Sequence, residues 1–262
     1  MKKIAITGAL ICMAAGLSFA QDATTTSTSD SKLRMAISAA PVFSWFTPDG
    51  EPNAIEGDGS RFSIKYGLHM DFQMGNNANY WVSTGLFMVN TGGSLVHPYA
   101  NRRSEQGNLQ EVRRNVDYRL NYLVIPINFK LMTNEIGYNR YFARVGFDLG
   151  LAVNSRFDSD DSFVLPPAAT VSRENASSED LTRFYRAALH IEAGMEYNIG
   201  GSTNIMVSLE WNNGLNNVFT KEKRAPVPIP QENGGESANV SLTGDRLESV
   251  INYVAINLGI YF

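Results

Sequence analysis

Cysteine, long apolar runs and cofactor motifs are scarce in this sequence. Its single cysteine is Cys12, within the first 20 of 262 residues. After residue 20 no apolar run approaches the roughly 20 residues that a transmembrane helix needs. The sequence contains no phosphate-binding loop, no zinc-ligand spacing and no dinucleotide fingerprint. We therefore expect no cofactor, no metal and no membrane-spanning helix in the mature chain.

The N-terminus has the three parts of a secretory signal peptide. A short basic start, Met1-Lys2-Lys3, precedes an apolar stretch, and Ser18 and Ala20 form a small-x-small cleavage site before Gln21. We expect cleavage after residue 20, which removes the cysteine and leaves no disulfide or thiol. The alternative is an uncleaved N-terminal anchor. A lipoprotein signal fits less well, because Ile11 rather than a small residue precedes Cys12. Residues 21–32 are rich in Ser and Thr, and we interpret them as a flexible periplasmic leader.

The charge balance is mildly acidic. The chain has 22 Lys and Arg against 26 Asp and Glu, a formal net charge of −4. Loss of Lys2 and Lys3 with the signal peptide would change it to −6. This balance argues against nucleic acid as a partner.

Alternation of apolar and polar residues with period two recurs through the mature chain, and it predicts strands whose two faces meet different surroundings. In one segment Phe62, Ile64 and Tyr66 alternate with Ser63 and Lys65. The pattern predicts eight strands in one domain, residues 33–262, each long enough for a tilted strand to cross a bilayer. Their ranges are 33–45, 61–74, 80–90, 117–131, 140–154, 183–199, 203–213 and 249–262.

The connections between these segments alternate in length. Three are short, residues 75–79, 133–139 and 200–202, and four are long, residues 46–60, 91–116, 155–182 and 214–248. Short periplasmic turns and longer extracellular loops are typical of outer-membrane barrels. We therefore expect an all-β, eight-stranded, antiparallel up-and-down transmembrane barrel with four long extracellular loops, three short periplasmic turns and both termini in the periplasm. Unpaired strand edges are costly in lipid, so the first strand should pair with the last.

The polar faces distinguish a membrane barrel from a soluble one with an apolar interior. They carry glycines and five charges of each sign, which can pair in a confined lumen. Aromatic residues near both ends of the apolar faces suggest two interfacial rims. The predicted polar network of the lumen contains Arg34, Lys65, His69, Asp71, Arg144, Asp148, Arg186, His190, Glu192, Glu196 and Glu210, with Lys130 as the fifth cation. Asn154 is also expected on the lumen side.

Residues 122–131, YLVIPINFKL, resemble the signature of PorT-like outer-membrane β-barrel proteins of Bacteroidetes. The residues that carry the resemblance are Tyr122, Leu123, Ile125, Pro126 and Lys130. Asn128 stands where the family usually has Leu, and it should face the lumen. The resemblance implies a porin-family barrel without implying a particular activity. The chain ends in Phe262, preceded by alternating apolar residues, which resembles the signal read by the barrel-assembly machinery.

Pro126 removes a backbone donor and is unusual inside a central strand. We interpret it as a bulge or kink on the lumen side that redirects the strand. The alternative is that residues 117–131 form two separate pieces.

Two histidines are candidates for chemistry. His69 and His190 are expected in the lumen near Asp71 and Glu192, where a His–carboxylate pair could act as a general base. No serine is placed beside a histidine by spacing, so we expect a hydrogen-bonded network and no enzyme. Residues 158–161, DSDD, lack the glycine and glutamate of an EF-hand and suggest a solvated acidic loop.

These patterns predict a small outer-membrane barrel with a side-chain-filled lumen and a structural or surface-interaction role, because eight strands enclose little more than their own side chains. The alternatives are a narrow solute channel and a lipid-modifying enzyme that uses His69 or His190. Expected partners are outer-membrane lipid and lipopolysaccharide, the barrel-assembly machinery and an envelope protein or glycan. Basic residues of the second long loop suit lipopolysaccharide phosphates: Arg102, Arg103, Arg113 and Arg114.

Overall fold

A computed structural model describes residues 32–48, 56–103, 109–163, 170–178, 181–220, 227–228, 239–240 and 248–262. The expected signal peptide, residues 1–20, and all of the expected leader except Lys32 lie outside the described residues. No helix in the described part of the chain is long and apolar enough to cross a membrane. The strands are β1 (Leu33–Pro48), β2 (Glu56–Gln73), β3 (Tyr80–Arg103), β4 (Leu109–Met132), β5 (Asn139–Phe163), β6 (Thr170–Ser177), β7 (Tyr185–Gly200), β8 (Thr203–Gly214), β9 (Val227–Pro228), β10 (Asn239–Val240) and β11 (Ser249–Tyr261).

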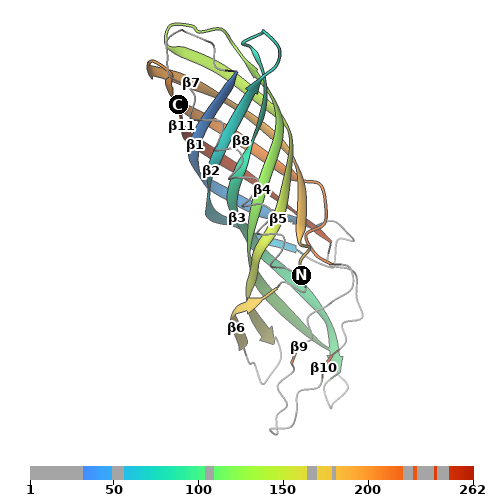
Figure 1. Cartoon of the computed structure of the whole chain (residues 1–262). Helices are drawn as coiled ribbons and strands as arrows, with labels where there is room; N and C mark the ends of the chain where they lie inside the picture. The colour runs from blue at the N-terminus through green and yellow to red at the C-terminus, as the bar shows by residue number, and fades with distance from the viewer. Residues whose placement is uncertain are drawn as a thin grey trace. The chain divides into compact units, whose positions relative to one another are not determined.

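Eight strands close into an antiparallel barrel, which confirms the predicted fold class (Figure 1). They follow the order β1, β2, β3, β4, β5, β7, β8 and β11. β11 pairs with β1, for example through Ile37 opposite Ile260, as the cost of open edges in lipid predicts. Among the described residues, β6 pairs only with β5, and β9 pairs with β10.

The two faces of the wall divide by polarity. Apolar side chains such as Ile37, Leu149 and Leu258 are more than half exposed on the outward face. Charged side chains such as Arg144 and Glu210 are buried in the lumen. Aromatic side chains near both ends of the outward face are exposed, among them Phe62, Tyr80 and Phe262. An apolar outside and a polar inside reverse the arrangement of a soluble barrel, because lipid is the solvent of the outer face.

Strands extend much further than predicted at one end of the barrel. β3 continues to Arg103, β4 begins at Leu109 and β5 reaches Phe163, so the loops expected at 91–116 and 155–182 are in large part paired strands. The predicted boundaries place the end of each strand at the membrane surface. Two strands of a hairpin can instead continue their backbone hydrogen bonding beyond the membrane, into water. We call this the hairpin end, and the end with residues 74–79, 133–138 and 201–202 the short-turn end.

The bulge expected at Pro126 is absent from the described strand β4. Pro126 faces the lumen within one continuous strand, and the register to β5 is unbroken from Tyr122 to Met132. The register to β3 is also unchanged across the proline, from Ile127 opposite Thr84 to Val124 opposite Phe87. Thr84 Oγ1 donates to the Pro126 carbonyl at 2.8 Å. This hydrogen bond replaces part of the backbone pairing that the proline interrupts, so the strand needs no kink.

A bulge does occur in β5, at Val153. Asn121 of β4 pairs with Asn154, while the next residue, Tyr122, pairs with Ala152. The extra residue reverses the alternation beyond it, because two residues of β5 oppose one position of β4. Ser155 is consequently buried, and Asn154 lines a pocket on the outward face. The prediction that Asn154 faces the lumen is therefore wrong.

Candidate functional site

The lumen near the short-turn end holds a connected set of buried charges. The structure places all eleven residues of the predicted polar network and Lys130 in the lumen, where Arg34 is partly exposed and the others are buried. His69 stands apart from the connected set, because its hydrogen bond among the described residues goes to Ser38. Strict alternation along β1, β2, β4, β5, β7 and β8 puts these side chains on the inner face.

Lys130 lies at the centre of the first part of this network. Its ammonium donates to Asp71 Oδ2 and Glu196 Oε1, each at 2.6 Å, and to the Tyr261 hydroxyl at 3.3 Å. Glu196 also accepts from Arg34 at 2.5 Å. Three acceptors therefore satisfy the three N–H donors of a fully buried cation.

Arg144 joins this part of the network to the next. Its guanidinium donates to Glu192 at 2.7 Å and to the Tyr261 hydroxyl at 2.5 Å. The Tyr261 hydroxyl in turn donates to Asp71 at 2.8 Å. The rings of Phe142 and Tyr261 lie within 4.7 Å of the Lys130 ammonium, and Phe142 at the same distance from the Arg144 guanidinium. The cations are thus enclosed by carboxylates and aromatic faces.

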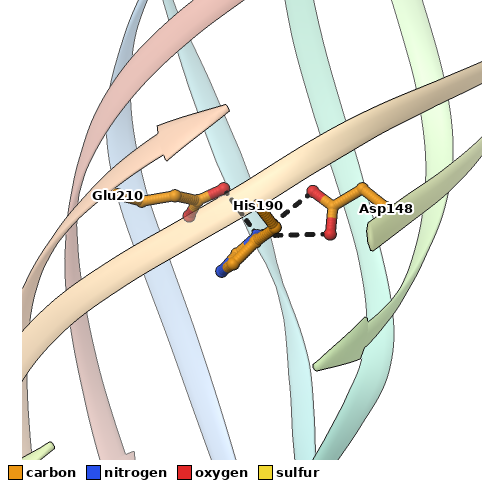
Figure 2. A group of neighbouring side chains, drawn as sticks. All are labelled: Asp148, His190 and Glu210. Carbon is orange, nitrogen blue, oxygen red and sulfur yellow. Dashed lines mark hydrogen bonds and ion pairs between the residues drawn. The ribbon is translucent and has the colours of Figure 1, made fainter. Parts of the chain in front are cut away.

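His190 of β7 lies between carboxylates. Figure 2 shows its ring between Asp148 of β5 and Glu210 of β8, at 3.2 Å and 3.5 Å from Nδ1. Nε2 lies 3.2 Å from Glu192. Ligand atoms of Asp148, His190 and Glu210 lie within 4.8 Å of one another, a spacing that could hold a metal ion. Glu210 Oε2 already accepts from the Lys65 ammonium at 2.6 Å and Glu210 Oε1 from the Tyr253 hydroxyl at 2.8 Å, so a metal ion would have to compete with partners that both oxygens already have.

The pairing of charges differs in one respect from the expected match of five cations with five anions. Arg186 donates to Asn212 Oδ1 at 2.5 Å and to the Ile251 carbonyl at 3.1 Å, and it forms no ion pair with a carboxylate in the described part of the chain. Asp148, the acid that Arg186 would have matched, pairs with His190 and accepts from Asn212 at 2.6 Å. Alternation predicts which side chains are inside, but not which of them touch.

A serine does lie beside a histidine, which the sequence spacing did not reveal. Ser38 Oγ of β1 is 3.0 Å from His69 Nε2 of β2, and the His69 ring packs edge-on against Phe87. Both side chains are buried in the lumen. The pair has the atoms of a nucleophile and a base, but its burial separates it from lipid and solvent, and a catalytic pair must reach its substrate.

The lumen toward the hairpin end is apolar, a feature missed in the sequence. Val42 and Phe46 of β1, Leu95 of β3 and Leu120 of β4 face inward there and are buried. Phe219, which follows β8, packs among them and is fully buried. Its ring stacks on Phe46 and meets the edge of Tyr118, at centroid distances of 5.9 Å and 5.1 Å.

Backbone contacts hold Phe219 in place. Arg183 Nε donates to its carbonyl at 3.2 Å, Thr220 N donates to the Leu181 carbonyl at 2.9 Å, and Val218 N donates to the Ser249 carbonyl at 2.9 Å. We call residues 215–220 the plug segment. Its one sequence signal is the apolar pair Val218-Phe219 within a polar stretch whose composition predicts an extracellular loop.

The remaining candidate residues are dispersed. In the resembling motif Tyr122 is buried in the lumen, Leu123 is half-buried and Ile125 is exposed on the outward face. Phe262 is exposed, and its backbone N–H donates to the Met35 carbonyl at 3.0 Å. The side chains of the four loop arginines, Arg102, Arg103, Arg113 and Arg114, lie outside the described residues, as does that of Asp161 in the acidic stretch.

The match to a protein-family model agrees with the architecture. Residues 19–220 match the family model of the outer membrane protein beta-barrel domain. No curated protein matches the chain significantly in sequence. Similar solved structures include the Neisserial surface protein A, NspA (6% identity, 87% of this chain and 95% of that chain, TM-score 0.39). Others are Ail of Yersinia pestis (12%, 87% and 99%, 0.30) and the outer membrane protease OmpT of Escherichia coli (11%, 91% and 98%, 0.35).

Proposed function

Because the chain belongs to the outer membrane protein beta-barrel domain family, we propose that it acts in the bacterial outer membrane as a closed, side-chain-filled barrel with a structural or surface-interaction role. One observation carries this proposal: side chains of two kinds fill two successive parts of the lumen. The charged network fills it toward the short-turn end, and the apolar cluster with Phe219 fills it toward the hairpin end.

Physical chemistry favours a filled lumen over a narrow channel. A solute path would have to separate buried ion pairs such as Lys130–Asp71 and Arg144–Glu192, and it would also have to displace Phe219. Breaking one buried pair by removing a partner typically costs about 3–5 kcal/mol, because a charge is left uncompensated. Water can replace only part of that energy in an eight-stranded barrel, whose interior is about as wide as its side chains.

The test is conductance in a planar lipid bilayer. We expect purified protein to give no stable, discrete openings under conditions in which an open general porin conducts. The Phe219→Ala variant should also remain closed, because the charged network lies in series with the plug segment. Discrete openings of the wild-type barrel would refute the closed lumen and favour the narrow-channel alternative.

The lipid-modifying alternative is tested separately. It predicts a mass change in lipid A that depends on the gene and that wild-type protein restores but His190→Ala or His69→Ala does not. We expect no such change, because His69 and His190 are both buried in the lumen.

Export and assembly are part of the proposal. We propose that residues 1–20 are a cleaved signal peptide, that residues 21–32 are a periplasmic leader and that the barrel-assembly machinery reads Phe262. The outward apolar face would then contact outer-membrane lipid, and the hairpin end would face the exterior. N-terminal sequencing of protein from the outer membrane should begin at Gln21; an intact Met1 would contradict cleavage.

Membership in the PorT-like group of Bacteroidetes is a finer proposal, supported by the motif around Pro126. An exterior partner, whether an envelope protein, a glycan or lipopolysaccharide, would meet the hairpin formed by β3 and β4. Deleting residues 97–114 should then abolish partner binding and leave the barrel folded, as judged by its faster gel mobility before heating. Unchanged binding of the deletion variant would contradict this role of the hairpin.

A further inference from the structure

A pocket of about 580 Å³ opens on the outward face of the wall, toward the hairpin end. Residues of β1 to β5 line it, so it is separate from the charged network of the lumen. Three arginines contribute to its lining: Arg61 of β2, Arg119 of β4 and Arg156 of β5. Basic side chains gathered in a concave site on an otherwise apolar wall indicate a ligand with negative charge.

A local irregularity between β2 and β3 creates the pocket. Ser60 pairs with Gly93 and Lys65 with Val89, so residues 61–64 oppose the three residues 90–92. Ser63 Oγ and Ser44 Oγ bridge the opening by donating to the carbonyls of Asn90 at 2.5 Å and Gly92 at 2.9 Å. A Cβ on Gly92 would come within 2.8 Å of Arg61 Cδ, so the glycine leaves room for Arg61 to lie over β3.

Polar side chains form two rows across the pocket. The strand registers place Asn90, Asn121 and Asn154 side by side on β3, β4 and β5. One step further toward the hairpin end, Gly92, Arg119 and Arg156 form the next row. Amide and guanidinium N–H groups therefore converge on one site.

The positive charge of the pocket is only partly neutralised. Arg119 forms an ion pair with Asp158. The backbone N–H of Asn175 and the Arg119 guanidinium donate to the Asp158 carboxylate and hold its pKa below the ordinary value, so this acid stays charged. In the part of the chain that the structure describes, no carboxylate lies within ion-pair distance of Arg61 or Arg156. Arg156 Nε donates to Asn154 Oδ1 at 3.4 Å, and the carboxylates of Asp117 and Asp158 act on Arg61 from beyond ion-pair distance. Among the described residues, the terminal nitrogens of both guanidinium groups therefore remain available for an external anion.

The pocket lies where the apolar band of the wall ends. Tyr66 and Leu151 are about half exposed in that band, and Phe62 and Ile64 line the pocket itself. From Leu123 in the band to Arg119 the chain advances four residues, which is roughly 13 Å along the strand. A tilted strand advances less than this along the membrane normal, so Arg119 lies close to the headgroup region, which is about 5–7 Å thick on each side of the hydrocarbon, and arginine side chains near the interface reach it.

We propose that Arg61, Arg119 and Arg156 bind the phosphate of an acylated, phosphorylated lipid of the outer leaflet. Guanidinium groups bind phosphate oxygens bidentately, and the asparagine amides supply hydrogen bonds to the neighbouring headgroup oxygens. Phe62 and Ile64 contact the start of an acyl chain. The assignment relies on the proposed orientation of the barrel, with its hairpin end outside, and not on the closed state of the lumen.

The experiment is native mass spectrometry of the purified, delipidated mature protein in detergent. It is titrated with diphosphorylated lipid A, with dephosphorylated lipid A and with inorganic phosphate. We expect one lipid A per barrel at saturation. The Arg61→Gln/Arg156→Gln variant should bind it about tenfold more weakly or worse, as the loss of charge-assisted hydrogen bonds predicts.

The matched control is Lys32→Gln/Arg140→Gln, which removes the same charge from exposed side chains near the short-turn end. It should bind like wild type. Both variants must show heat-modifiable gel mobility, which demonstrates a folded barrel. Equal binding by Arg61→Gln/Arg156→Gln and wild type, or equal binding of dephosphorylated lipid A, would overturn the proposal. Saturable binding of inorganic phosphate without lipid A would assign the pocket to free phosphate instead. Channel openings would contradict the closed lumen without affecting this test.

Discussion

At the scale of single residues, Lys130 shows how a membrane barrel can bury a charge. Its side chain is fully buried, and its acceptors come from β2, β7 and β11. Sequence alternation was sufficient to predict that Lys130 faces the lumen. It could not predict the partners, because they depend on how seven other strands are staggered against β4.

Replacing Lys130 with Met keeps the approximate length of the side chain but leaves Asp71 and Glu196 without their shared cation. We expect a loss of about 3–5 kcal/mol in the free energy of unfolding, since two buried carboxylates lose their compensation. Guanidinium unfolding of the detergent-solubilised barrel, followed by tryptophan fluorescence, measures it. Arg140→Met is the control, because the Arg140–Glu135 pair is about 40% exposed and should contribute within about 1 kcal/mol. Equal losses for the two variants would contradict a role of burial.

At the scale of elements, the bulge of β5 explains where sequence alternation failed. The pattern correctly predicts the outward face from Tyr141 to Val153, and it then fails because the extra residue exchanges the two faces. Periodicity cannot predict a bulge, because nothing in the apolar pattern marks the residue that is skipped. The lengths of β3 and β4 differ from the prediction for a related reason: their extensions are polar on one face, and that composition predicts loops.

Deleting Val153 should remove the bulge and leave both faces of the β5 extension as they are, because Asn121 and Tyr122 would then oppose consecutive residues of β5. The mature protein is expected to lack cysteine, so Arg156→Cys provides a single label site. We expect a membrane-impermeant maleimide to label this cysteine at the same rate with and without the deletion. Ser155→Cys, buried in the parent, should stay protected in both. Slower labelling at Arg156→Cys together with faster labelling at Ser155→Cys after the deletion would contradict the assigned bulge.

At the scale of the whole molecule, closure of the sheet was predictable and the filling of its lumen was predictable only in part. Eight alternating segments and the cost of open edges in lipid determine the ring and the pairing of β1 with β11. The charged residues of the lumen were visible in the alternation. Phe219 was not, because it reaches the interior from a connection and contacts residues more than 100 positions away, such as Phe46.

Phe262 gives a prediction at the same scale. Its side chain is exposed on the outward face and supports no core. If the barrel-assembly machinery reads it, Phe262→Ser should lower the amount of folded protein in the outer membrane severalfold in cells. Refolding of the same variant from urea into detergent should remain close to wild type. Ile260→Ser, which changes another exposed apolar residue of β11, is the control; an equal defect in cells would contradict a specific terminal signal.

The network of the lumen has a consequence for how the barrel comes apart. Every barrel strand contributes to it: Arg34, Asp71, Ser83, Lys130, Arg144, Glu192, Glu210 and Tyr261 come from β1, β2, β3, β4, β5, β7, β8 and β11 in turn. Peeling away any one strand would therefore leave charges or polar groups of the others without partners in a low-dielectric interior. A partly opened barrel is penalised more than either the closed or the fully separated state. We expect cooperative, all-or-none unfolding, because the ion pairs and hydrogen bonds of this network together connect all eight strands.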